Sequence, residues 1–129
     1  MAEGFPATTG DIFTAADYNG LVAFTVGAAN TADYTAVIAD AYQVLEVMNK
    51  ATAIAFKIPT NASVAFPIGT VLTVLNIGVG TCTISAVTSG TTTVLSAGAV
   101  AAAPTLARYK SAACIKTGTD TWYVVGAIA

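Results

Sequence analysis

The chain has 129 residues, a length at which a single domain with a substantial core is typical. It carries five basic and seven acidic side chains, no histidine and 55% hydrophobic residues. Charged residues make up 9% of the chain, against about 25% in a typical soluble domain. Because so few charges cannot cover a globular surface, we expect outer faces to be buried against copies of the chain or a larger assembly. The sequence shows no Lys/Arg stripe of the kind that binds nucleic acid, so we expect no nucleic-acid partner.

Residues 61–107 contain no charged side chain, which raises the question of a membrane segment. Pro67, Pro104 and several glycines interrupt this stretch, and threonine and serine are frequent in it. A spanning helix needs about 20 consecutive, mainly apolar residues. The stretch therefore predicts strands and turns, and we expect no membrane partner. The amino terminus lacks a basic start followed by an apolar run, so no secretory signal is expected.

Residues 1–29 are predicted to form an N-terminal arm and a short helix. Thr14 is a candidate N-cap for a helix over residues 15–25, and Asp17 occupies the third helical position. A short isolated helix is marginal in water, so this one is expected to dock either on its own β domain or on a neighbouring subunit. We favour the neighbouring subunit. The arm's large apolar side chains are the candidate assembly contacts: Phe5, Phe13, Tyr18, Leu21 and Phe24.

Residues 30–129 have the pattern of a β domain, with short apolar runs separated by Gly, Pro, Asn and Thr/Ser clusters. Ten short strands in about a hundred residues predict a mainly β fold, an antiparallel β-sandwich or barrel-like domain. The strands are expected near Tyr34–Ile38, Val44–Met48, Ala53–Ile58, Ser63–Phe66, Val71–Asn76, Thr81–Val87, Thr92–Ser96, Leu106–Tyr109, Ala112–Lys116 and Trp122–Val125.

One of these strands shows a clear two-residue period. Ile54, Phe56 and Ile58 share one face, and the other face is mainly alanine, with Ala53 and Ala55. Such a face is too small to form a core and too weakly polar to be a typical solvated surface. We therefore add Ala53 and Ala55 to the candidate assembly interface.

Cys82 and Cys114 are too few for a disulfide framework and too far apart for a zinc motif. Both lie in strand-like apolar surroundings, where a free cysteine behaves as a small hydrophobic residue. We predict two buried, unpaired thiols. A disulfide between them stays open if their strands pair.

The chain offers few groups for catalysis. Without histidine, Ser-His-Asp triads, Cys-His pairs and most transition-metal sites are excluded. A glycosidase needs two carboxylates facing each other across a sugar, and the spacing of the acidic residues along the chain does not indicate such a pair. We expect no enzyme, no cofactor and no metal. Trp122, the single tryptophan, is expected in the core or an interface, the alternative being a platform for a sugar.

Five short segments, in their order along the chain, resemble a β-rich module of tailed-bacteriophage virion structural proteins, found in head-associated and tail-fibre-like proteins. They are Val44–Asn49, Phe56–Pro59, Phe66–Thr70, Gly78–Gly80 and Ile115–Trp122. The two most specific motifs among them are Phe66-Pro67-Ile68-Gly69-Thr70 and Gly118-Thr119-Asp120-Thr121-Trp122. The resemblance covers about residues 40–126, and residues 9–19 also look like the opening of small phage structural proteins. Neither motif is a catalytic signature. The sequence shows no shaft repeats and no pattern of a second domain, so we do not expect a long fibre.

The resemblance implies a subunit of the virion, assembled in the host cytoplasm, that binds and does not catalyse. We expect a homotrimeric capsid decoration or cement protein that stabilises the shell by bridging subunits of the major capsid protein. The alternative is a tail-fibre or spike tip that binds a host-surface polysaccharide. A polysaccharide-cleaving enzyme is a third and weaker reading, because the chain is small and has few carboxylates.

Overall fold

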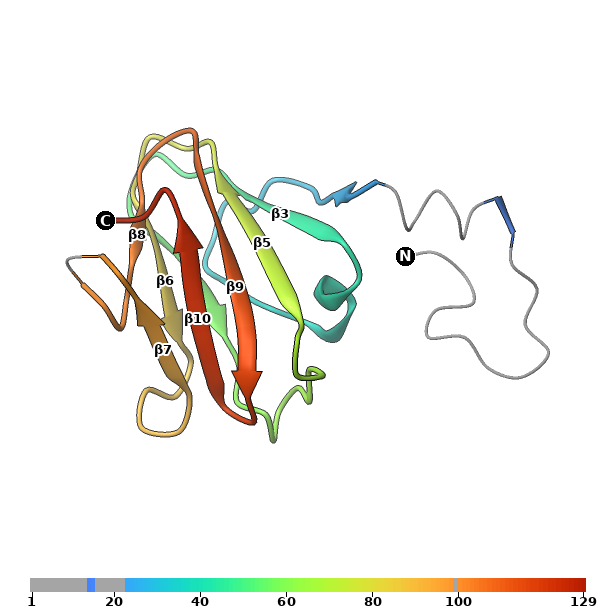
Figure 1. Cartoon of the computed structure of the whole chain (residues 1–129). Helices are drawn as coiled ribbons and strands as arrows, with labels where there is room; N and C mark the ends of the chain where they lie inside the picture. Colours follow the sequence, from blue (N-terminus) through green and yellow to red (C-terminus); the bar gives the residue numbers. More distant parts are fainter. Residues whose placement is uncertain (1–13, 16–22, 99) are drawn as a thin grey trace.

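The computed structural model describes residues 14–15, 23–98 and 100–129, and the chain there is mainly β (Figure 1). Most of the predicted arm and helix therefore lies outside the described residues. The elements are β1 (Thr25–Val26), β2 (Tyr34–Thr35), the 3-10 helix η1 (Ile38–Ala41), β3 (Val44–Met48), β4 (Ile54–Ile58), β5 (Val71–Asn76), β6 (Cys82–Ala86), β7 (Thr93–Ser96), β8 (Thr105–Leu106), β9 (Lys110–Gly118) and β10 (Thr121–Gly126).

The predicted mainly β fold is confirmed, and β3 and β5 have the predicted bounds. The strands expected at 34–38 and 106–109 are shorter, as β2 (Tyr34–Thr35) and β8 (Thr105–Leu106). Two further local expectations were wrong. Residues 63–66 form no strand, because the amides of Ser63 and Val64 both donate to the carbonyl of Thr60 and close a tight turn. The helix does not continue to residue 25, because the Thr25 amide donates to the Gln43 carbonyl and Thr25–Val26 forms β1.

The chain crosses between two sheets at almost every connection. Sheet A has the order β1-β3-β5-β9-β10-β7 and sheet B the order β2-β4-β6-β8. Odd-numbered strands thus belong to sheet A and even-numbered strands to sheet B, until β9 and β10 form a hairpin within sheet A.

Most strand pairs formed across one intervening strand of the other sheet are parallel. These are β1/β3, β3/β5, β2/β4 and β4/β6, whereas β6/β8 is the exception. β7 and β10 are parallel as well. Among the described strands, antiparallel pairing is confined to β5/β9, β9/β10 and β6/β8. Both sheets are therefore mixed, and the expectation of an antiparallel domain was wrong in this respect.

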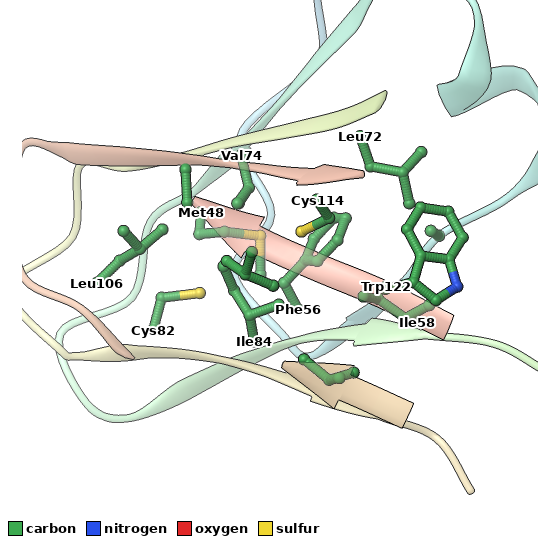
Figure 2. Packing of buried hydrophobic residues seen from close by; sticks show 14 of the residues in the cluster. Met48, Phe56, Ile58, Leu72, Val74, Cys82, Ile84, Leu106, Cys114 and Trp122 are labelled. Atoms are coloured by element: carbon green, nitrogen blue, oxygen red, sulfur yellow. The ribbon is translucent and has the colours of Figure 1, made fainter. Parts of the chain in front are cut away.

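One hydrophobic core fills the space between the sheets (Figure 2). Sheet B contributes Ile54, Phe56 and Ile58, as the two-residue period predicted, and Trp122 enters from β10 of sheet A. Trp122 packs edge-to-face against Phe66, with 5.6 Å between the ring centroids. The core position expected for the tryptophan is thus confirmed. The other members come from both sheets and include Met48, Leu72, Val74, Ile84, Val94, Leu106 and Val124.

Cys82 and Cys114 are both free and fully buried in this core. The prediction of two unpaired thiols is confirmed. Figure 2 shows their side chains among the aliphatic residues of the cluster. Burial raises the pKa of Cys82 to about 11 and that of Cys114 to about 12, because an apolar environment disfavours the thiolate.

A buried lysine near the C-terminal end of β9 holds the neighbouring loops by hydrogen bonds. Lys116 is 2% exposed, and its Nζ donates to Asn61 Oδ1 and to the Phe66 carbonyl, both at 2.7 Å. Burial lowers the pKa of this ammonium group, because desolvation disfavours the charge. The turn residue Asp120 accepts from the Asn61 amide at 2.8 Å and from the Thr92 hydroxyl at 3.3 Å. These bonds tie the 60–70 loop to the β9–β10 turn.

Candidate assembly surface

The outward face of sheet A is formed by the residues that alternate with its core positions. In β10, Trp122 and Val124 point into the core, so Tyr123 and Val125 point outward. The same alternation in the neighbouring strands places further residues on this face. We define the outer face of sheet A as Val26, Leu45, Val47, Val71, Thr73, Leu75, Thr93, Leu95, Ser111, Ala113, Ile115, Thr117, Tyr123 and Val125.

Strand register arranges these residues in rows that cross the sheet. Tyr123 is paired with Ile115 on β9 and with Leu95 on β7, and Ile115 is in turn paired with Val71 on β5. A second row runs from Val125 through Ala113, Thr73 and Leu45 to Val26. The strands β5, β9 and β10 that carry both rows lie side by side in Figure 1.

This face is mainly apolar and, apart from the buried Val47, its residues are half-buried or exposed. Five of its large side chains, Val26, Val71, Leu95, Tyr123 and Val125, are between 37% and 66% exposed. The strand residues that define the face include no charged side chain. A contiguous apolar surface of this kind marks an interaction site more often than an isolated exposed hydrophobic residue does.

A shallow groove of about 440 Å³ runs along the edge of this face between β7 and β10. Its lining is mainly apolar and includes Leu95, Ala97, Tyr123, Val125 and Ile128. The groove gives this face a recess into which a partner side chain can insert.

The outward face of sheet B has a different character. Ala55 stands beside Thr83, and Lys57 beside Ser85. Lys57 Nζ lies 3.9 Å from Asp33 Oδ2, in an exposed ion pair. The alanine-rich face expected from β4 is thus surrounded by hydroxyl and charged groups supplied by other strands.

Three of the predicted interface residues, Phe24, Ala53 and Ala55, lie in the described part of the chain, and Phe24 is beside sheet A whereas the two alanines belong to the region of sheet B. Ala53 is exposed just before β4, Ala55 is half-buried on the outward face of sheet B, and Phe24 is exposed just before β1. Phe5, Phe13, Tyr18 and Leu21 lie outside the described residues. The sequence analysis missed the outer face of sheet A. The sequence pattern that could have predicted this face is the alternation in β10, where Tyr123 and Val125 flank the inward Val124.

A second feature that the sequence analysis missed is a buried acidic cluster beside β3. Asp40 in η1 and Glu46 in β3 are both buried. Asp40 Oδ2 accepts from the Tyr34 hydroxyl at 2.7 Å and from the Val37 amide at 2.9 Å. Glu46 Oε2 accepts from Asn30 Nδ2 at 3.3 Å. The signal was the position of Glu46, which shares the inward side of β3 with Met48.

The surroundings of this cluster raise the pKa values of two of its groups, Glu46 and Tyr34. Burial and the neighbouring Asp40 carboxyl raise the pKa of Glu46 above its ordinary value. Burial and the hydrogen bond to Asp40 raise the pKa of Tyr34 as well. The Asn30 side chain also donates to the Val47 carbonyl at 3.1 Å, so the cluster links the segment after β1 to β3. Its groups bind one another inside the fold, which indicates a structural role.

In the described part of the chain, no group of three or more His, Cys, Asp or Glu side chains is placed to hold a metal ion. Within the same residues, no helix has the length and hydropathy to cross a membrane.

Comparison with known proteins gives no relative: no family model, curated protein or solved structure matches the chain.

Proposed function

We propose that the chain is a structural subunit of a bacteriophage virion, a homo-oligomeric capsid decoration protein that stabilises the shell by bridging capsid subunits. The observation that carries this proposal is the uncharged, apolar and exposed outer face of sheet A. The motifs around Phe66–Thr70 and Gly118–Trp122 support the virion assignment through their resemblance to phage structural proteins. A trimer is the oligomer that this resemblance favours.

The free energy gained by burying the outer face of sheet A can be compared with the free-energy cost of association. Full burial of a large apolar side chain contributes about 1.5–3 kcal/mol. Five side chains that are roughly half exposed therefore contribute on the order of 5 kcal/mol. Association itself costs about 4–15 kcal/mol. The outer face of sheet A alone thus offsets only the lower end of this cost, and stable assembly requires additional contacts.

The proposed role is mechanical. Contacts that span neighbouring shell subunits oppose their separation, because the apolar area they bury would be exposed again when the subunits part. This role needs no catalytic group and no cofactor. Both motifs also stabilise the fold. The Phe66 carbonyl accepts a hydrogen bond from the buried Lys116, and Asp120 accepts one from the Asn61 amide.

Copy number in purified particles tests the proposal. Particles are prepared from the phage or prophage whose genome encodes the chain, and its amount is measured against the major shell protein by quantitative mass spectrometry. A decoration protein should approach the abundance of the shell protein. A few copies per particle would instead indicate a tail-fibre or spike tip that binds a polysaccharide, and absence from the particle would contradict a virion role.

A further inference from the structure

One end of the fold gathers most of the basic residues. Three connections between the sheets meet there, at residues 49–53, 77–81 and 107–109. Glycines allow the first two to touch: a Cβ at Gly78 would overlap the backbone of Lys50, and one at Gly80 would overlap the Thr52 carbonyl oxygen. The third connection is tied to the second, since Arg108 Nε donates to the Ile77 carbonyl at 3.1 Å.

Lys50, Arg108 and Lys110 lie on or next to these connections, and we call this region the basic end. Lys110 is paired with Asn76, directly before the 77–81 connection. Of the remaining basic residues, Lys57 is paired with Asp33 and Lys116 is buried. Within the described part of the chain, no salt bridge involves Lys50, Arg108 or Lys110.

The basic end also presents apolar groups. Tyr109 is 70% exposed, and the Arg108 guanidinium carbon lies 4.6 Å from the centroid of its ring. Tyr109 has φ +63°, a left-handed conformation that bulky residues rarely adopt. Its amide donates to the Asn76 carbonyl, which holds the turn in place. Val79 on the neighbouring connection is also exposed. Residues held in such conformations are found preferentially at binding sites.

The acidic residues of the β domain are already engaged. Asp40 and Glu46 are buried together, Asp33 is paired with Lys57, and Asp120 accepts two hydrogen bonds from the loops around it. The other three acidic residues of the sequence, Glu3, Asp11 and Asp17, all lie in residues 1–22, a segment with no Lys or Arg. That segment also contains the aromatic residues Phe5, Phe13 and Tyr18. These could pack against the exposed apolar side chains of Tyr109 and Val79 at the basic end.

We propose that the acidic N-terminal segment, residues 1–22, of one subunit docks on the basic end of a neighbouring subunit. The inference rests on the proposed homo-oligomer and names the additional contact that its energetics require. The matching charges supply orientation and the aromatic groups supply apolar area.

Strand direction favours a neighbouring subunit over the segment's own domain. β1 is parallel to β3, with Thr25 opposite Val44, and β3 ends at Met48, directly before the 49–53 connection. The chain before Thr25 therefore leaves from the end of β3 that is farthest from its own basic end. To dock on its own domain, the segment would have to turn back along the whole length of the strand.

Charge reversal tests the inference. An end-reversed chain carries Lys50→Glu, Arg108→Glu and Lys110→Glu, and an arm-reversed chain carries Glu3→Lys, Asp11→Lys and Asp17→Lys. Either chain alone should self-associate roughly tenfold more weakly than the wild type at 50 mM salt, as measured by sedimentation velocity. The difference should shrink at 500 mM salt, where screening is stronger. Circular dichroism and thermal unfolding check that both chains fold.

Mixing the two reversed chains identifies where the segment docks. Docking between subunits predicts that the mixture recovers association, because each arm then meets an end of opposite charge. No recovery would contradict docking on a neighbour and indicate docking within one chain. As a control for general attraction, the arm-reversed chain is mixed with a chain whose arm is neutralised by Glu3→Gln, Asp11→Asn and Asp17→Asn. This control chain also carries Thr35→Glu, Thr83→Glu and Ser85→Glu on the outward face of sheet B. Neither arm then meets a basic or acidic end of opposite charge, and no recovery is expected.

The outcomes also separate this inference from the proposed function. If the end-reversed chain associates as strongly as the wild type, the arm does not dock on the basic end, although the oligomer stands. If the wild-type chain itself is a monomer, the proposed homo-oligomer is contradicted, and with it the docking between subunits.

Discussion

Tyr123 of β10 stands directly across from Ile115 of β9 on the outward face of sheet A. Leu95 of β7 and Val71 of β5 extend the pair on either side, so one apolar row crosses four strands. The four residues come from segments that span more than fifty positions of the chain. The row therefore exists only once the sheet has formed, and it gives a weakly charged chain a defined surface for association.

The buried acidic cluster predicts an unusual dependence of stability on pH. The folded pKa of Glu46 is raised above its ordinary value of 4.5, so the folded state holds this proton more tightly than the unfolded chain does. The resulting stabilisation is complete below the unfolded pKa and is lost as pH rises through the folded pKa. Glu46→Gln keeps a hydrogen-bonding amide and removes the titration. We expect the variant to be more stable than the wild type at pH 8, by about 1 kcal/mol.

Urea unfolding of both proteins between pH 4 and pH 8 measures this effect. The stability advantage of Glu46→Gln should grow as pH rises. Asp33→Asn, which changes an exposed carboxyl in the Asp33–Lys57 pair, is the control and should stay within about 0.5 kcal/mol of the wild type. An advantage of Glu46→Gln that does not change with pH would show that Glu46 is not the group that titrates.

The two thiols should be inert while the protein is folded. Burial raises the pKa of Cys82 to about 11 and that of Cys114 to about 12, so almost no thiolate forms at pH 8. Iodoacetamide should label neither residue in the native protein and both after unfolding. Replacing both with alanine should leave the oligomer intact and cost about 1–2 kcal/mol through small cavities. Rapid labelling of the native protein would contradict the buried assignment.

The contact between the two crossing connections predicts a strong dependence on one glycine. A Cβ at Gly80 would overlap the Thr52 carbonyl oxygen, whereas one at Gly90 would meet no heavy atom within 4 Å. We expect Gly80→Ala to destabilise the fold by about 3 kcal/mol or more, since backbone must move to make room. Gly90→Ala should be neutral or stabilise slightly. Equal unfolding midpoints for the two variants in guanidinium chloride would contradict this account of the crossing.

Local pattern predicted the strands well where apolar residues alternate. β3 and β5 have the predicted bounds, and the inward set Ile54, Phe56 and Ile58 was identified from one strand alone. Parallel pairing was not predicted, because it follows from the crossing of the chain between sheets. No single strand carries that information.

The interface shows the same limit. Alternation revealed that Ala53 and Ala55 share a face, but Thr83, Ser85 and the Lys57–Asp33 pair around them come from other strands and from register. The outer face of sheet A likewise depends on which strands are neighbours. The inward position of Glu46 was readable from the sequence, whereas its proximity to Asp40 required the fold of η1 against β3.

Association through the outer face of sheet A is the central claim, and sedimentation of a charged variant tests it most directly. Tyr123→Lys/Val125→Lys places two ammonium groups in the middle of the face, while Thr83→Lys/Ser85→Lys places them on the outward face of sheet B as a matched control. The account predicts an oligomeric wild type at micromolar concentration, a control within about twofold of it, and a Tyr123/Val125 variant that dissociates on the order of 100-fold more readily, with its fold retained. A monomeric wild type, or a Tyr123/Val125 variant that associates as strongly as the control, would contradict it.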